Sequence, residues 1–161
     1  MFMGIDCSSK TIHITVLDEK GDVEYMEKWE SKEKDMDERM ISLFAQFDNW
    51  LNQKQQAFHP FAHYTAVVEN PIYVQNIKAT VGIAQVIAAV KIALSRYHMV
   101  TFGIDNRTWK KSVVGDGRSD KAKIMKFAQA KWGDVFKEQD WADAACLAFW
   151  GAQRLGRMTN E

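Results

Sequence analysis

Apolar and polar residues alternate along the first part of the chain with the period of two that is typical of β-strands. An apolar run over residues 2–5 leads directly into one acid, Asp6, and Ile12, Ile14 and Val16 then alternate with polar neighbours. A turn over residues 18–22 is followed by a third segment of the same character. The predicted strands of this meander are residues 2–5, 11–17 and 23–29.

From residue 36 onward the apolar positions follow a helical spacing, and short apolar runs recur between the helical segments. The segment 76–97 is apolar over much of its circumference. Ser119 is the expected N-cap of the helix that begins at residue 121. The predicted helices are 36–55, 76–97, 121–132 and 138–155, with a short helical turn at 106–111, and the remaining strands are 64–69 and 99–104. This order predicts an α/β fold, in which helices pack on the faces of a mixed five-stranded sheet.

The composition is ordinary for a globular protein, with 161 residues, 47% of them apolar and 26% charged. This length fits a single domain, residues 1–161, that buries a core without disulfides. No apolar run approaches the ~20 residues of a membrane span, and the start shows no signal-peptide pattern. Cys7 and Cys146 lack a metal-ligand spacing, so we expect two free thiols in a cytoplasmic protein.

A net charge of zero conceals an asymmetry between the two halves of the chain. Residues 1–80 carry 8 Lys+Arg and 13 Asp+Glu, whereas residues 81–161 carry 13 and 8. Basic residues concentrate in one segment: Arg107, Lys110, Lys111, Arg118, Lys121, Lys123 and Lys126. A basic face confined to one segment is a possible nucleic-acid footprint even in a neutral protein.

Four acids occupy positions that suggest a shared site. Asp6 and Glu69 each close an apolar strand, and Asp140 and Asp143 lie three residues apart near the start of the last helix, so they share a face. If the first and fourth strands are parallel neighbours, Asp6 and Glu69 meet at the strand ends where open α/β sheets keep their sites. Four clustered carboxylates would repel one another unless divalent cations bound there, and ligation by oxygen alone suits Mg²⁺ or Mn²⁺.

Each of these features also has a structural explanation. A single acid at a strand end often forms a turn, and an acidic pair in a first helical turn is favourable against the helix dipole. The basic residues fit a solvated helix face. Taken together, the acids and the basic segment just upstream of the last pair favour the metal interpretation.

The chain resembles the RuvC family of Holliday-junction resolvases, within the RNase H-like superfamily, and in particular a small phage-type member. The residues that carry the resemblance are Gly4-Ile5-Asp6 followed by Ser8-Ser9, Val67-Val68-Glu69, Val113-Val114-Gly115 after a basic pair, and Asp140-Trp141-Ala142-Asp143-Ala144-Ala145. Their order and approximate spacings span nearly the whole chain.

The resemblance implies an endonuclease that depends on Mg²⁺ or Mn²⁺, with two ions per active site, and acts as a homodimer on four-way DNA junctions. By position, the metal-binding carboxylates of the family are matched by Asp6, Glu69, Asp140 and Asp143. Lys110 and Lys121 match the two lysines that flank the family's active site. Further contact with the DNA backbone is expected from Arg107, Lys111, Arg118, Lys123 and Lys126.

Two positions depart from the cellular family. Cys7-Ser8 replaces the usual Pro-Gly after the first acid, which predicts a differently built turn. Tyr73 lies where the family has a Phe that stacks on bases at the crossover, and it either stacks in the same way or packs inward. The helix over 76–97 is the expected dimer interface, because a two-fold dimer presents two equivalent sites to a symmetric junction. Its alternative is burial within one subunit.

Three other functions fit parts of the sequence. An ATP-binding domain of the actin and sugar-kinase type also starts with an acid on a hairpin, but it needs Gly-rich phosphate loops and a second domain. A non-cleaving junction-binding protein would keep the fold and the basic face, and the four intact acids count against it. A broader nuclease that debranches forks, flaps and three-way junctions stays open.

Overall fold

The computed structural model describes residues 1–58, 63–71 and 76–156, which form five strands and five helices. The strands are β1 (Phe2–Cys7), β2 (Thr11–Leu17), β3 (Val23–Glu30), β4 (Thr65–Glu69) and β5 (Val100–Ile104). The helices are α1 (Met36–Phe58), α2 (Ile77–Arg96), α3 (Asn106–Val114), α4 (Lys121–Trp132) and α5 (Gln139–Arg154). Every predicted element is present, with ends that differ by a few residues.

The strands form one mixed sheet in the order β3-β2-β1-β4-β5. β1 pairs antiparallel with β2 and parallel with β4, and β4 pairs parallel with β5. The predicted α/β class, the mixed five-stranded sheet and the parallel pairing of the first and fourth strands are therefore confirmed. This pairing sets the carboxyl ends of β1 and β4 side by side at one edge of the sheet.

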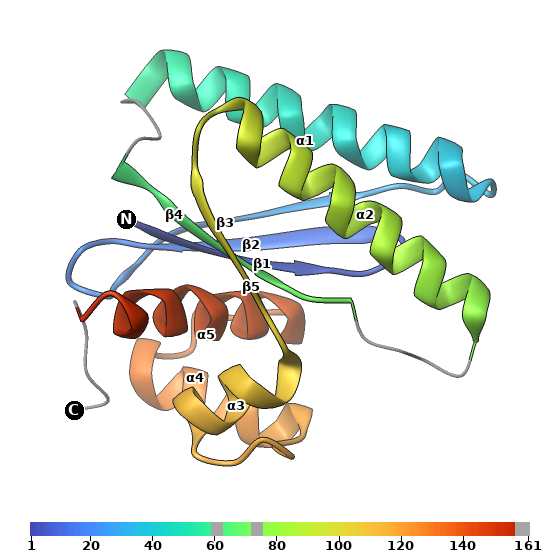
Figure 1. Ribbon diagram of the computed structural model, residues 1–161. Coiled ribbons are helices and arrows are strands. Elements are labelled where there is room, and N and C mark those ends of the chain that lie inside the picture. Colours follow the sequence, from blue (N-terminus) through green and yellow to red (C-terminus); the bar gives the residue numbers. More distant parts are fainter. Residues whose placement is uncertain (59–62, 72–75, 157–161) are drawn as a thin grey trace.

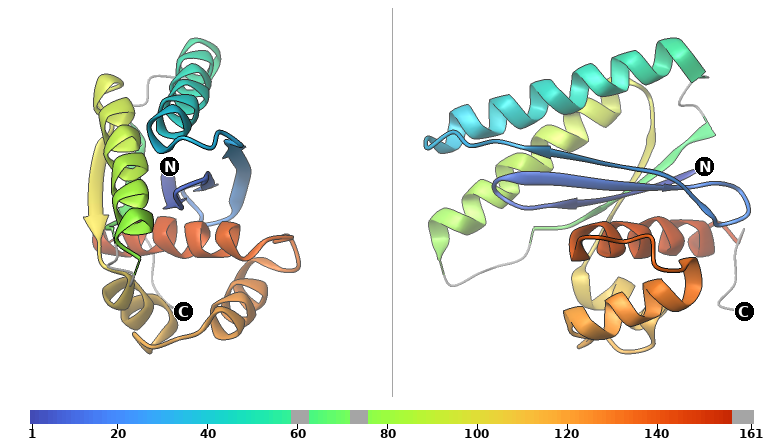
Figure 2. Two further views of the ribbon diagram at one scale, coloured as in Figure 1. Left: turned by 90° about the vertical axis from the view of Figure 1, so that its right-hand side faces the viewer. Right: turned by 180° about the vertical axis from the view of Figure 1, so that it is seen from behind.

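Helices cover both faces of the sheet (Figure 1). α1 and α2 pack against each other over one face, and α5 crosses the other face above β1, β2 and β4. α3 and α4 contact α5 and lie farther from the sheet, as Figure 2 shows from two further directions. The basic segment predicted between residues 107 and 126 therefore lies on the same side of the sheet as α5.

Alternation along β1 decides which residues face α5. Met3 and Ile5 are fully buried in the core beneath α1 and α2, whereas Phe2 belongs to the core beneath α5. Gly4 and Asp6 share the α5 face with Phe2 because side chains alternate along a strand. A Cβ atom at Gly4 would overlap the carbonyl oxygen of Ala144 in α5. The missing side chain lets α5 lie directly on β1, next to Asp6.

Two details differ from the sequence-based prediction. Ser119 is not the N-cap of α4, because its hydroxyl donates to the Asp116 carbonyl oxygen at 2.7 Å. Asp120 is the N-cap, and its side chain accepts from the Lys123 backbone N–H at 2.8 Å. The short turn predicted at 106–111 is a nine-residue helix that ends at Val114 and is followed by the C-cap Gly115, whose φ of 87° suits glycine.

α2 departs from the expectation that no segment has the length and apolar character of a membrane span. Of the helices in the described residues, α2 alone is long and apolar enough to cross a membrane, judged by length and composition only. One side of it, including Val86, Val90 and Leu94, is buried in the core against the sheet. The core helix of a soluble protein has the same length and composition, so this property does not by itself indicate a membrane.

Candidate metal centre

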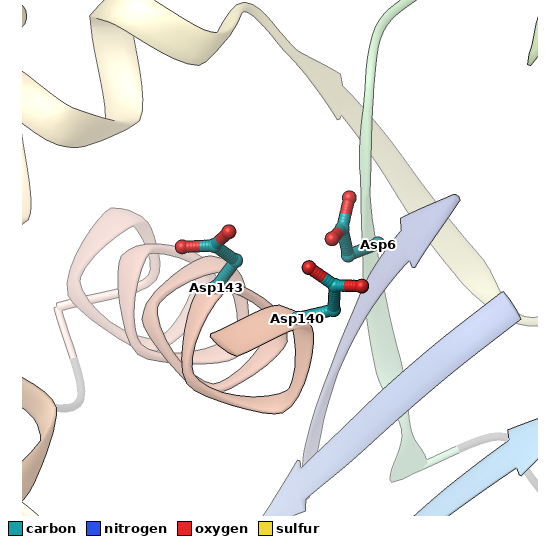
Figure 3. A group of neighbouring side chains, drawn as sticks. All are labelled: Asp6, Asp140 and Asp143. Atoms are coloured by element: carbon teal, nitrogen blue, oxygen red, sulfur yellow. The ribbon is translucent and has the colours of Figure 1, made fainter. Parts of the chain in front are cut away.

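Three aspartates converge at the edge of the sheet where β1 ends. Asp6, Asp140 and Asp143 each offer one carboxylate oxygen, and these three oxygens lie within 4.8 Å of one another. Figure 3 shows Asp6 on β1 and the other two on α5, with the three carboxylates near one another. All three are half-buried. This aspartate trio, from the first strand and the last helix, is the centre of the candidate site.

The start of α5 is held in place by the neighbouring strands. The Thr15 hydroxyl donates to the Trp141 carbonyl oxygen at 2.9 Å, and the Trp141 indole N–H donates to the Glu27 carbonyl oxygen at 3.1 Å. Thr15 is fully buried. These two bonds fasten the segment between Asp140 and Asp143 to β2 and β3, so the two carboxylates are presented by a fixed helical turn.

A second set of charged groups lies behind Asp140. His13 is buried on β2 directly opposite Asp6, and its Nε2 lies 3.2 Å from a carboxylate oxygen of Glu138. The Lys28 ammonium group donates to the same oxygen at 2.8 Å. This ammonium group, followed by His13, lowers the pKa of Glu138. His13 Nδ1 lies 3.8 Å from an Asp140 oxygen. The imidazole therefore lies between the aspartate trio and the ion pair of Glu138 with Lys28.

Glu69 approaches the trio from β4, but its carboxylate is held by α3. The Asn106 amide donates to Glu69 Oε1 at 2.9 Å, and the Trp109 indole N–H donates to Glu69 Oε2 at 2.7 Å. Glu69 is not part of the group within 4.8 Å, although its charge acts on Asp6 and Asp143. The structure thus brings the four predicted acids to one edge, three in close contact and Glu69 beside them.

Burial and mutual repulsion raise the pKa values of Asp6 and Asp143. Burial raises the pKa of Asp6 well above its usual range, and the Asp143 and Glu69 carboxylates raise it further. Burial also raises the pKa of Asp143 to about 6, although a hydrogen bond from Gln139 opposes the rise. Lys121 lowers the pKa of Asp6, which places its charge near the cluster. A cluster of this kind is relieved by protons or by a bound cation.

The donor set fits a hard divalent cation. The aspartate trio offers only carboxylate oxygens, which suit Mg²⁺ or Mn²⁺ and do not favour zinc. Cys7 follows Asp6 in β1, but burial raises the pKa of its thiol, and the nearby Asp6 carboxylate raises it further. Cys7 and Cys146 are both free cysteines. Sulfur therefore does not compete with the oxygen donors of the trio.

The predicted basic residues lie on α3, on α4 and on the loop between them. Lys110 lowers the pKa of Asp143, so its charge also acts on the cluster. Arg107 and Lys111 are exposed and line a surface depression together with Thr108 and Ser112. Lys123 pairs with Asp116 at 3.3 Å. Two further exposed basic residues of this surface are Arg118 and Lys126. Tyr73 lies outside the described residues.

Sequence reasoning missed three residues of the site. The sequence pattern predicts His13 only as a polar position in an alternating strand, yet the same alternation puts it on the face of Asp6. It predicts Asn106 and Trp109 only as part of a short helical turn. A helical start directly after β5, next to the end of β4, was the available signal that these residues could reach Glu69.

Comparisons with known proteins identify a family and a shared fold. A family model described as crossover junction endodeoxyribonuclease RuvC matches residues 2–150. A solved structure of Thermus thermophilus RuvC is 16% identical, with a TM-score of 0.72 and coverage of 96% of both chains. A structure of T. thermophilus RuvC in complex with a Holliday junction substrate is 13% identical, with a TM-score of 0.73 and the same coverage. Both likenesses establish a shared fold. A comparison with curated proteins finds no match.

Proposed function

Because the chain belongs to the RuvC family of crossover junction endodeoxyribonucleases, we propose that its aspartate trio and Glu69 form the active site that cuts four-way DNA junctions. The observation that carries this proposal is the convergence of Asp6, Asp140 and Asp143 within 4.8 Å. Such a carboxylate cluster supports hydrolysis of phosphodiester bonds. The solved relative bound to a Holliday junction substrate supports branched DNA as the partner.

The carboxylates would hold two divalent cations, Mg²⁺ or Mn²⁺, in each active site. Bound there, such ions activate a water molecule and stabilise the leaving oxygen of the phosphodiester. Asp6 lies on the sheet, and Asp140 and Asp143 lie on α5, so these residues would hold a cation from two separate elements. Neighbouring carboxylates contribute to the raised pKa values of Asp6 and Asp143. A bound cation would offset this repulsion between like charges, which supports the assignment.

Lys110 and Lys121 are proposed to place positive charge beside the scissile phosphate. Both act on acids of the site, Lys110 on Asp143 and Lys121 on Asp6. A lysine ammonium group is a compact charge that suits this position. The exposed basic residues of α3, α4 and the loop between them extend the contact along the DNA backbone: Arg107, Lys111, Arg118, Lys123 and Lys126. Stacking of Tyr73 on bases stays a proposal.

A homodimer through α2 would present two such sites to the two symmetric strands of a junction. Ile77, Val81, Ala88 and Ile92 follow one another at intervals of four, seven and four residues, which places them on one face of α2. All four are exposed, Ile77 to 70% and Ile92 to 58%. An apolar stripe opposite the buried side of the helix supports contact with a second copy.

Action on DNA supports a location inside the cell. The resemblance to a small phage-type member suggests that the protein works in the cytoplasm of a bacterial host.

The test uses labelled four-way, three-way, forked and linear duplex DNA, incubated with the purified protein and Mg²⁺, Mn²⁺ or EDTA. We expect paired cuts in the four-way junction only when a divalent cation is present. Efficient cutting of forks and three-way junctions would instead identify a broader debranching nuclease. Binding without cutting under every condition would identify a non-cleaving junction-binding protein.

Asp6→Asn provides the matched variant for this assay. It keeps the size of the side chain and removes one charged metal ligand, so cleavage should be abolished while the junction is still bound in a gel shift with EDTA. Retained cleavage would show that Asp6 is not a metal ligand.

A further inference from the structure

The carboxylate of Glu69 accepts hydrogen bonds from two neutral side chains of α3, Asn106 and Trp109. We propose that Asn106 and Trp109 are positioning residues for Glu69, which hold its carboxylate beside the aspartate trio and so determine how tightly the site binds a divalent cation. The inference rests on the proposed function, because it assumes that Glu69 is a metal ligand.

Packing in the core fixes the orientation of the Trp109 side chain. It is completely buried and packs in the α5-side core with Val113, Ile124 and Phe149. An indole N–H is a donor only, and a buried one needs an acceptor. The Glu69 Oε2 atom supplies it at 2.7 Å, a short distance typical of a bond to a charged acceptor. The packing of the ring therefore fixes the direction of the donor.

The start of α3 is tied to the end of β4 by a second set of contacts. The Asn70 backbone N–H donates to the Ile104 carbonyl oxygen at 2.8 Å, and its side-chain amide donates to Asp105 at 3.2 Å. Gly103 makes room for this arrangement, because a Cβ atom there would overlap the Asn70 side-chain oxygen. Glu69 and the two donors are thereby kept at a fixed separation.

Without these donors, electrostatics would drive Glu69 away from the trio. Glu69 and Asp143 both raise the pKa of Asp6, so like charges face one another across the site. A glutamate side chain has several rotatable bonds and would turn toward solvent. The hydrogen bonds from Asn106 and Trp109 oppose this rotation without adding charge. Each carboxylate oxygen keeps a further lone pair for a cation. Partners of this kind commonly contribute about 10–100-fold to metal affinity.

Trp109→Phe removes the donor and keeps most of the ring. This choice also leaves a ring face for Lys110, whose ammonium group lies 5.6 Å from the Trp109 ring centroid. Trp132→Phe is the matched control, because the Trp132 indole N–H also donates at 2.7 Å, but to the Gly21 carbonyl oxygen, away from the site. Asn106→Leu is the second variant, at a half-buried position at the start of the helix.

The measurement is Mn²⁺ binding to the protein without DNA, by titration calorimetry and by the paramagnetic resonance of free Mn²⁺. Trp109→Phe and Asn106→Leu should each bind Mn²⁺ about 10–100-fold more weakly than the wild type, whereas Trp132→Phe should bind it as the wild type does. Wild-type affinity in both site variants would overturn the inference and leave the proposed function intact. A wild type that binds no Mn²⁺ would overturn both.

A nuclear magnetic resonance spectrum of the indole N–H groups gives a readout that is independent of affinity. The signal that disappears in Trp109→Phe belongs to Trp109, and it should move when Mg²⁺ is added, because its acceptor then also binds the cation. The Trp132 signal should stay in place. If the Trp109 indole signal does not shift at saturating Mg²⁺, Glu69 is not a metal ligand positioned by Trp109.

Discussion

Asp143→Asn should make the metal-free protein more stable, although it removes a residue of the proposed active site. The substitution deletes the charge and keeps the Oδ1 atom that accepts from the Gln139 amide at 3.1 Å. Burial is the main cause of the rise in the pKa of Asp143 from the ordinary 3.8 to about 6. The ionised carboxylate therefore costs folding free energy, and a neutral amide avoids the part of this cost that comes from the charge.

The size of this cost follows from the pKa. Each pH unit between the folded and unfolded pKa values is worth about 1.36 kcal/mol, so a rise of about two units gives an upper limit of about 3 kcal/mol. Because Asp143 is partly accessible to solvent, we expect about 2 kcal/mol of it to remain. For a domain of this length that is an increase in Tm of about 4–8 °C.

The sign with pH is also defined. The unfolded chain releases the Asp143 proton near pH 4 and the folded chain near pH 6, so the wild type loses stability as pH rises through this interval. The advantage of Asp143→Asn should therefore be full at pH 8 and largely absent at pH 4. Thermal unfolding followed by circular dichroism in EDTA measures both.

A control and a metal titration complete the test. Asp134→Asn is matched, because Asp134 is exposed and also accepts from a glutamine amide, that of Gln129 at 3.1 Å; it should leave Tm unchanged. Saturating Mn²⁺ should stabilise the wild type more than Asp143→Asn and so reverse their order. The reasoning is refuted if Asp143→Asn is no more stable than the wild type in EDTA at pH 8.

Three further predictions address the lysines, the core and the dimer. Lys121→Ala should slow junction cleavage far more than it weakens junction binding in a gel shift with EDTA, and an equal loss of both would reduce Lys121 to a backbone contact. Gly4→Ala should cost at least about 1–3 kcal/mol of unfolding free energy in a urea titration, because the new Cβ atom overlaps the Ala144 carbonyl oxygen; an unchanged midpoint would mean that α5 lies farther from β1. Ile92→Glu, on the exposed face of α2, should convert a dimer to monomers in sedimentation velocity, and a monomeric wild type would contradict the proposed interface.

The sequence was sufficient for the fold and for the approach of the acids. Strand alternation, helical spacing and the position of Asp6 and Glu69 at the ends of two runs predicted the sheet, and the parallel pairing of β1 with β4 confirmed it. The spacing of Asp140 and Asp143 predicted a shared face. These patterns work because burial imposes the same period on every residue of a strand or helix.

The finer contacts of the site could not be predicted, because they depend on side chains far apart in sequence. The sequence around His13 does not predict its contact with Glu138, which lies 125 positions away. The sequence around Trp109 does not predict its hydrogen bond to Glu69. The N-cap of α4 was misassigned because Ser119 and Asp120 are both good capping residues, and only the hydrogen bond of Ser119 to Asp116 decides between them. Local propensity does not record such competition.

The seating of α5 against β1 has a consequence for the time course of synthesis. The bond between Thr15 and Trp141 joins positions 126 residues apart, so a ribosome that adds about 5–20 residues per second needs roughly 6–25 seconds to produce the second after the first. During that interval Asp6 is present without Asp140 or Asp143. A nascent chain that stalls before α5 therefore carries only Asp6 and Glu69 of the four acids proposed for the site.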